Sequence, residues 1–336
     1  MTFLVPVGLL LFCAALIYLF CELFVNGIEW LGQKWHVGAT AVGTILAAFG
    51  TALPESVVTL MAVLFGRSGA EKDIGLGSAM GGPLVLSTLA YGVVGLSLLA
   101  RGRGRRGAAA GAPLDADVGQ LAFDQGVFLG TFCVKVLLGL FVWAYKPYAA
   151  AGFVLIYGAY LYHELNRQEP QAEAAALEPL TFARKQAVPP LTLVLAQVGL
   201  AVGVIAWAAH LFVAQLKVLG ELSHVPGHVV ALVLSPVATE LPEILNACIW
   251  VRQGKERLAL ANISGSMMIQ ATLPSAMGMA LTPWLFDGPL LVAAAVTMVA
   301  IAMMRLALTR GRLTARHLMV GPPLYALFMG YLVLRG

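Results

Sequence analysis

Charged residues are scarce in this sequence, and long polar stretches are missing. Asp, Glu, Lys and Arg make up 11% of the 336 residues, whereas hydrophobic residues make up 60%. A soluble domain contains about 25% charged residues, so this composition cannot cover a protein surface in water. It therefore excludes a soluble protein and predicts that lipid surrounds most of the chain.

Disulfide frameworks and basic patches are missing as well. All four cysteines fall inside apolar segments, which argues against a secreted disulfide scaffold, and none has the spacing of zinc ligands. The net charge is only +4 and no basic stripe with interleaved aromatic residues is present, so we expect no nucleic-acid partner. The cysteines are Cys13, Cys21, Cys133 and Cys248.

Long apolar runs dominate what is present. A helix needs about 20 apolar residues to cross the hydrocarbon core of a membrane. The second, third, seventh and eighth runs contain Gly, Pro or polar residues in mid-span, which predicts broken helices. The fold class is therefore an all-α polytopic membrane protein. Its ten expected transmembrane helices cover residues 3–24, 37–65, 74–100, 120–144, 147–164, 189–216, 225–251, 257–282, 285–306 and 314–334.

Lysine and arginine are concentrated in alternate loops. The loops after the odd-numbered spans carry most of them, and the positive-inside rule places those loops in the cytoplasm. We therefore expect both termini outside the cell membrane (plasma or inner) and the linker at residues 166–188 in the cytoplasm. The Ala/Glu-rich centre of this linker predicts either a solvated tether or a short surface helix. The basic residues are Lys34, Arg101, Arg103, Arg105, Arg106, Arg167, Arg184, Lys185, Arg252, Lys255, Arg257, Arg305, Arg310, Arg312 and Arg316.

Two similar motifs indicate an internal repeat. GTALPE at residues 50–55 and ATELPE at residues 238–243 align without gaps, together with the two spans around each of them. Five spans separate the copies, and because five is odd the second copy must cross the membrane in the opposite direction. The chain then divides into a five-helix repeat at 1–165 (motif 42–90), the linker at 166–188, and a second repeat at 189–336 (motif 229–278). Further matched pairs are Val42 with Val230, Gly77-Ser78 with Gly265-Ser266, and Ser87 with Ser275.

The Pro-Glu pairs have a chemical meaning at this depth. Proline leaves backbone carbonyls without a donor, and a carboxylate in lipid needs a partner. Carbonyl, hydroxyl and carboxylate oxygens are ligands that Na⁺ and Ca²⁺ prefer, so Glu55 and Glu243 predict a shared acidic cation site. We expect Gly77 and Gly265 to allow neighbouring helices to approach closely. The alternative interpretation is two kinked helices whose glutamates extend to the interface.

These stretches resemble the alpha repeats of the cation/calcium exchanger superfamily, of which the sodium/calcium exchangers are the best-known branch. That family has G-T-S-L-P-E on the first broken helix of each repeat and G-N-x-I-G-S-N-I on the next; here DIGLGSAMGGP and LANISGSMMIQ follow the two motifs. The resemblance implies a ten-helix transporter with outward termini in which Glu55 and Glu243 bind Ca²⁺ and Na⁺. It further implies roles in the sodium sites and the surrounding cavity for Thr51, Thr239, Ser78, Ser266 and Asn262.

The sequence departs from the family pattern at four positions. Where the family has Asn or Asp four residues after the Gly-Ser serine, this chain has Gly82 and Gln270. The motif serine is Ala52 in one repeat and Glu240 in the other. Glu240 either joins the site as a third carboxylate or points elsewhere. Closely spaced carboxylates cannot all stay ionised, which leaves H⁺ as a counter-ion beside Na⁺.

The function that these features predict is secondary active antiport, in which Ca²⁺ or a similar cation moves against Na⁺ or H⁺ by alternating access. The expected partners are the lipid bilayer and the transported cations, with no cofactor, and the oligomeric state stays open. The alternatives are an H⁺- or K⁺-coupled exchanger of another cation, a transport-inactive relative, and, least favoured, an intramembrane enzyme. Lys135, in the fourth span, could pair with a site carboxylate or Asp124, but we expect its long stem to reach the interface.

Overall fold

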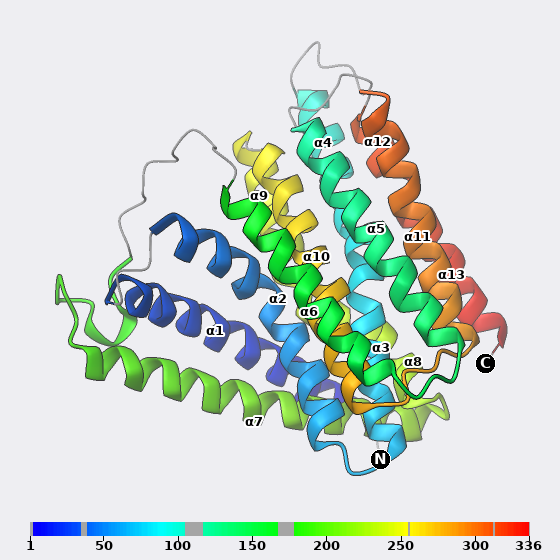
Figure 1. The fold of residues 1–336 in the computed structure, drawn as a ribbon, viewed down its shortest axis with the longest axis horizontal. Coiled ribbons are helices and arrows are strands. Elements are labelled where there is room, and N and C mark those ends of the chain that lie inside the picture. Colours follow the sequence, from blue (N-terminus) through cyan, green and yellow to red (C-terminus); the bar gives the residue numbers. More distant parts are fainter. Residues whose placement is uncertain are drawn as a thin grey trace.

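The computed structural model describes residues 3–34, 39–104, 117–166, 178–254, 256–311 and 313–335. Within these ranges the chain is helical and has no strand, which confirms the all-α fold class (Figure 1). Two short elements interrupt the α-helices, the π-helical turn η1 (Leu86–Ala90) and the 3₁₀ turn η2 (Thr181–Ala183). The α-helices are α1 (Leu4–Lys34), α2 (Ala39–Phe65), α3 (Gly69–Val85), α4 (Tyr91–Gly104), α5 (Val118–Leu140), α6 (Lys146–Asn166), α7 (Leu191–Ser223), α8 (Gly227–Thr239), α9 (Leu241–Gln253), α10 (Glu256–Leu281), α11 (Gly288–Thr309), α12 (Ala315–Leu318) and α13 (Gly321–Arg335).

Six helical segments in the described ranges are long and apolar enough to cross a membrane. Helices also cover the remaining ranges expected from the sequence, but the count of ten spans stays a prediction. Since backbone polar groups in lipid must be paired within the segment, this helical architecture is the one that the composition requires. The six segments are Leu4–Lys34, Gly69–Ala100, Val118–Leu140, Leu191–Ser223, Gly288–Thr309 and Ala315–Arg335.

A predicted helix break occurs in one of the four runs. The third run contains the π-helical turn η1 after Pro83, but Gly69–Ala100 is one continuous helical segment, so no break is present there. In the seventh, α8 and α9 meet at Glu240, two residues before Pro242. The second and eighth runs form the continuous helices α2 and α10, so the expected break is wrong there. A single proline removes one backbone hydrogen bond and can bend a helix without ending it, and Figure 1 shows α2 changing direction along its length.

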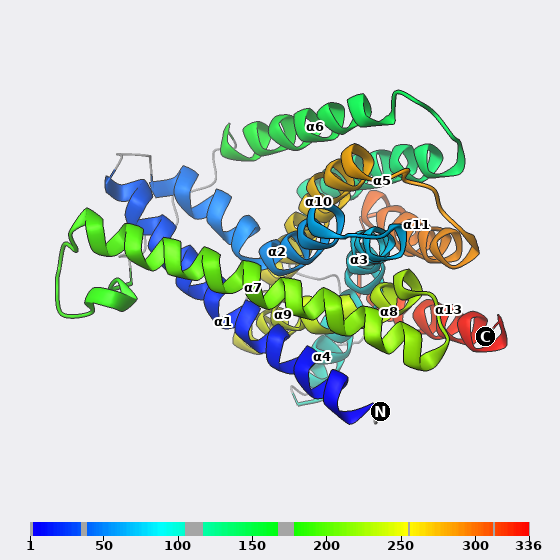
Figure 2. The same cartoon turned by 90° about the horizontal axis from the view of Figure 1, so that it is seen from below.

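Two helices that begin the predicted repeats lie together. Figures 1 and 2 show α1 and α7 side by side and oblique to most other helices, and they pack extensively on each other. Their buried apolar faces also contact α2, α3 and α8 through Val58, Ile74 and Ala231. This pair therefore covers one side of the central helices.

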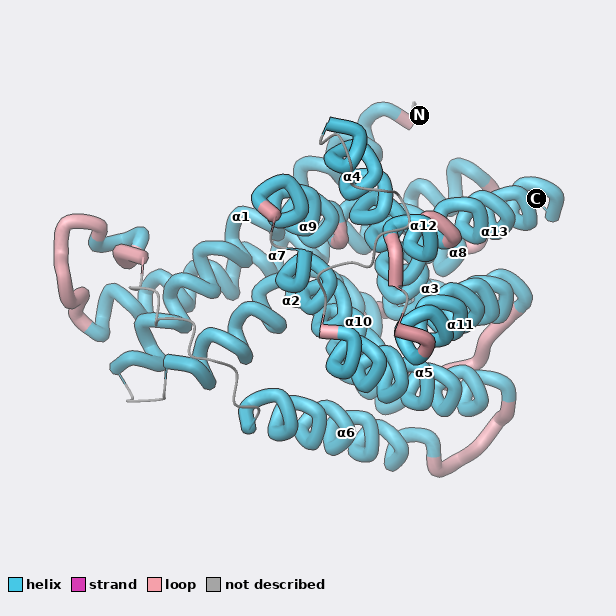
Figure 3. The backbone as a smooth tube through the Cα atoms, turned by 90° about the horizontal axis from the view of Figure 1, so that it is seen from above, coloured by secondary structure: helices cyan, strands magenta, loops and turns pink. Residues whose placement is uncertain are grey.

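In the centre of the molecule, helices of the first predicted repeat pack on helices of the second. The short first-repeat helix α3 packs along α8, and α10 packs along α2; α5 likewise lies beside α11 (Figure 3). Figure 3 also shows α6 at the edge of the bundle, against α10. The motif-bearing helices α2, α3, α8 and α10 are thus gathered in the middle of the molecule.

The described end of the central linker is docked on the protein. The Trp30 indole donates to the Glu178 carbonyl (3.0 Å), and the Phe182 amide donates to the Gln197 side chain (3.0 Å). This stretch is therefore held against α1 and α7 and is not a free tether. The Ala/Glu-rich centre lies outside the described residues.

Candidate cation site

Three glutamates are fully buried where the central helices meet. Glu55 lies on α2, Glu240 at the junction of α8 and α9, and Glu243 in the first turn of α9; each is 0% exposed. Pro242 cannot donate a backbone hydrogen bond, and the chain changes from α8 to α9 at Glu240. The break therefore sets the directions of both second-repeat carboxylates.

The carboxyl groups of Glu55 and Glu240 interact directly across the repeats. Both oxygens of Glu55 and the Oε2 atom of Glu240 have no hydrogen-bond partner within the described chain. Two buried carboxylates in contact repel each other unless a proton or a cation lies between them. The sequence left open whether Glu240 faces the site, and in the structure its carboxyl group faces Glu55.

Glu243, the repeat match of Glu55, interacts electrostatically with both other glutamates. Its charge acts on Glu55 less than that of Glu240 does, and it also acts on Cys21 and Tyr18 of α1. Both of its oxygens lack a hydrogen-bond partner among the described residues. Glu243 therefore lies toward α1, at the side of the Glu55–Glu240 pair.

Hydroxyl groups from α3 and α8 face one another nearby. The Ser78 and Ser235 hydroxyls lie 2.9 Å apart, and the Thr239 hydroxyl is within reach of the Ser235 carbonyl (3.1 Å) and Glu240 Oε1 (3.2 Å). The sequence pointed to Ser78 and Thr239 but missed Ser235. Its signal is its position one helical turn before Thr239, on the same face of α8.

The two matched glycines differ in their surroundings. A Cβ at Gly77 would collide with the His228 carbonyl of α8, so the expected close approach is present. A Cβ at Gly265 would have nothing within 4 Å, so the same expectation is wrong for the second repeat. The α3–α8 contact depends on a small residue, whereas α10 passes its neighbours at a greater distance at this point.

Gly82 is in contact with the first carboxylate. A Cβ at this position would overlap the Glu55 carboxyl group, so the absence of a side chain leaves the volume that Glu55 fills. Glu55 can therefore occupy this position because the chain has Gly82 where the family has Asn or Asp. A side chain of Asn or Asp size would exclude this arrangement.

The α10 residues line up along one helix face at intervals of four. Gln270 is fully buried and approaches Glu240, yet neither of its polar atoms has a hydrogen bond in the described structure. Ser266 is buried one turn earlier, and Asn262 is half-buried a turn before that with an unpaired Nδ2 atom. The side chain of Thr51 lies outside the described residues.

Two further polar residues belong to this region. Thr59 is buried one turn beyond Glu55, and its hydroxyl has no partner in the described ranges. Lys135 is 0% exposed, and its ammonium donates to the Ala79 carbonyl (3.2 Å), so the expectation that it reaches the interface is wrong. A lysine on an apolar helix reaches water only where the neighbouring helices leave room for its side chain. Here the side chain is buried and its ammonium contacts α3.

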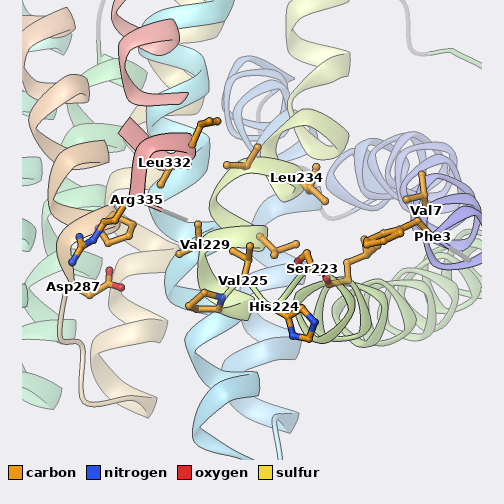
Figure 4. A pocket seen from close by; sticks show the side chains of 16 residues that line it. Phe3, Val7, Ser223, His224, Val225, Val229, Leu234, Asp287, Leu332 and Arg335 are labelled. Carbon is orange, nitrogen blue, oxygen red and sulfur yellow. Dashed lines mark hydrogen bonds between the residues drawn. The ribbon is translucent and has the colours of Figure 1, made fainter. Parts of the chain in front are cut away.

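The glutamates are packed into the protein core and do not line either large cavity. A cavity of about 860 Å³ lies between the start of α1, the α7–α8 turn, α8 and the end of α13 (Figure 4). Its lining includes Leu234, the neighbour of Ser235, but none of the three glutamates. A smaller cavity of about 290 Å³ includes Asp73 and Asp287 in its lining. Among the described residues, no group of three His, Cys, Asp or Glu side chains is close enough to hold one metal ion.

Comparison with known proteins identifies the class. The sequence model of the family described as sodium/calcium exchanger protein matches residues 5–165 and 193–335. The chain therefore belongs to the sodium/calcium exchanger protein family, whose members are membrane exchangers, and it is a multi-pass membrane protein. The resemblance found in the sequence is confirmed at the level of the family.

Individual relatives are more distant. Inner membrane protein YrbG of Escherichia coli (strain K12) is 23% identical over 76% of this chain and 74% of its own length. The crystal structure of the H⁺/Ca²⁺ exchanger CAX is 17% identical, with a TM-score of 0.72 over 98% of this chain and 82% of that one. A structure of the sodium-calcium exchanger NCX_Mj is 19% identical, with a TM-score of 0.57 over 98% and 100% of the two chains. These two likenesses establish a shared fold.

Proposed function

We propose that this protein is a secondary active antiporter that moves Ca²⁺, or a similar cation, across the membrane in exchange for Na⁺ or H⁺. The observation that carries the proposal is the contact between the Glu55 and Glu240 carboxyl groups, in which both Glu55 oxygens and Glu240 Oε2 lack a donor among the described residues. Buried carboxylates without donors are costly, and a bound cation offsets that cost. The neighbouring hydroxyls of Ser78 and Ser235 add the hard oxygen atoms that Ca²⁺ and Na⁺ prefer.

We propose further that the chain has ten spans in two inverted five-helix repeats, at 1–165 and 189–336, joined by the linker at 166–188. Two observations support this division. The family model matches each half separately. The contacts between the halves also come in equivalent pairs: α2 of the first half packs on α10 of the second, and their repeat counterparts α8 and α3 pack on each other. The termini would face outward and the linker the cytoplasm, as the loop charges indicate.

Alternating access would use the oblique α1–α7 pair. These helices cover the central helices through apolar contacts, and apolar faces slide past each other without breaking hydrogen bonds. Neutralisation of the glutamates by either cation species would allow the pair to cross the core, whereas an uncompensated carboxylate would oppose the movement. The site therefore changes access only when one of the two cation species is bound, and this couples the movement of one species to that of the other.

The test is transport by the purified full chain in liposomes. Uptake of radiolabelled Ca²⁺ is measured under an outward gradient of Na⁺, K⁺ or H⁺, one at a time. We expect uptake with Na⁺ or H⁺, and its loss in Glu55→Gln and Glu240→Gln, while Glu221→Gln, at an exposed position on α7, behaves as the unaltered protein. Uptake at the unaltered rate in Glu55→Gln would refute the site.

A transport-inactive relative is the second candidate, because no three acidic side chains converge on one point in the described chain. A transport-inactive protein would give a different result from an antiporter in the same assay. No gradient would drive uptake, although the folded protein would still be recovered from the membrane.

A further inference from the structure

The Lys135 ammonium replaces a backbone hydrogen-bond donor that Pro83 removes. Pro83 lies inside α3 and has no N–H, so the Ala79 carbonyl one turn earlier loses its normal helical donor. The Lys135 ammonium, coming from α5, donates to this carbonyl at 3.2 Å. The same ammonium lies 4.5 Å from the centre of the Phe132 ring, a favourable place for a cation.

This ammonium also lies near the Glu55 carboxyl group. Ala79, which accepts its hydrogen bond, is one helical turn from Gly82, which touches the Glu55 carboxyl group. An electrostatic interaction between Lys135 and Glu55 follows from this arrangement. Lys135 is 0% exposed, so water does not screen that interaction.

The charges in the region do not cancel. Glu55, Glu240 and Glu243 are all fully buried, and Lys135 is the cation whose charge acts on Glu55 among the described residues. Three carboxylates and one ammonium leave two negative charges when all are ionised. One divalent cation or two monovalent cations would complete the neutralisation.

We propose that Lys135 is a built-in monovalent cation of the exchange site and sets the number of counter-ions to two per divalent cation. The proposal rests on the proposed antiport function. Its ammonium takes the place that a third monovalent ion would otherwise fill beside Glu55. Because the fixed charge moves no ion across the membrane by itself, exchange of one Ca²⁺ for two monovalent ions is electrically neutral.

A lysine that only caps Ala79 would leave ion coupling untouched, so coupling is the property to measure. The full chain in liposomes takes up radiolabelled Ca²⁺ against internal Na⁺ or H⁺, with a membrane potential imposed by K⁺ and valinomycin. For the unaltered protein we expect uptake that is insensitive to the potential and depends on counter-ion concentration with an order of two. Potential-sensitive uptake of the unaltered protein, with an order of three, would overturn the proposal without any variant.

Two variants separate charge from packing. Lys135→Met keeps the length of the stem and removes the charge, and we expect potential-sensitive uptake, an order of three, and Ca²⁺ binding about tenfold tighter or more. Lys135→Arg keeps the charge, and we expect it to retain neutral exchange. Unchanged coupling in a folded Lys135→Met protein would overturn the proposal. If no gradient drives uptake in the unaltered protein, the antiport function itself fails.

Discussion

The Glu55 carboxyl group lies directly against the backbone of Gly82, in the volume that a side chain at position 82 would fill. Glu55 comes from α2 and Gly82 from α3, so this contact fixes how the two helices present oxygen atoms to the site. On its other side Glu55 meets Glu240 of the second repeat. The position of one carboxylate thus depends on the absence of a side chain opposite it.

Gly82→Ala is the direct test of this dependence. The added methyl group would overlap the carboxyl group and force Glu55 out of its position. Displacing a group that orients ligands costs about 10–100-fold in metal affinity, so we expect Ca²⁺ binding, measured by thermal shift with CaCl₂, to weaken by that range. Gly199→Ala, on α7 with open space around it, is the matched control. Equal binding in both variants would contradict the arrangement.

The matched glycines of the repeats make a second test, this time of stability. Gly77→Ala would push a methyl group into the His228 carbonyl, whereas Gly265→Ala enters open space. Overpacking costs about 1–3 kcal/mol, so we expect Gly77→Ala to lower the midpoint of thermal unfolding clearly. Gly265→Ala is expected to leave it unchanged or raise it slightly, because alanine favours helix. Equal midpoints in the two variants would show that the repeats pack alike.

Much of the fold could be predicted because lipid leaves the backbone few choices. An apolar run flanked by charges has to be helical, and the expected ranges coincide with helices within a few residues at most ends, although α1 and α7 run several residues further. Whether a proline ends a helix could not be predicted. Pro54 and Pro274 lie inside continuous helices, whereas α8 ends shortly before Pro242. That difference depends on tertiary packing around each proline.

The candidate site was predictable in its residue types but less so in its geometry. The repeat match made Glu243 the partner of Glu55, yet the direction of a side chain beside a helix break depends on the local backbone, and Glu240 is the one that meets Glu55. Lys135 could not be placed because its partner is a backbone carbonyl freed by a proline on another helix. No sequence pattern records such a contact.

The proposed orientation in the membrane can be tested by labelling single cysteines. In a background with the four native cysteines replaced, Gly69→Cys lies in the loop expected outside and Arg310→Cys in one expected in the cytoplasm; both positions are exposed. We expect a membrane-impermeant maleimide to label Gly69→Cys in intact cells and Arg310→Cys only after the membrane is permeabilised. Labelling in the reverse order would invert the assigned topology, and labelling of both in intact cells would place both loops outside.

The unequal roles of Glu240 and Glu243 lead to the last prediction. When both carboxyl groups are ionised and no cation is bound, the contact between Glu55 and Glu240 is repulsive, so at a pH where both are ionised Glu55→Gln or Glu240→Gln is expected to raise the unfolding midpoint in chelator while reducing the rise that CaCl₂ produces. Neutralising either partner removes the same repulsion, so the double variant gains little over each single one. We expect a coupling free energy of about 0.5–3 kcal/mol between positions 55 and 240.

Glu243 lies toward α1, and its coupling to Glu55 is expected to be smaller than that of Glu240. Thermal unfolding of the single and double Gln variants, with and without CaCl₂, measures both couplings in the same experiment. A larger coupling for positions 55 and 243 would mean that the two repeat-matched glutamates form the pair. Glu240 would then be a neighbour of the site, and the symmetry of the motifs would extend to the geometry of the carboxylates.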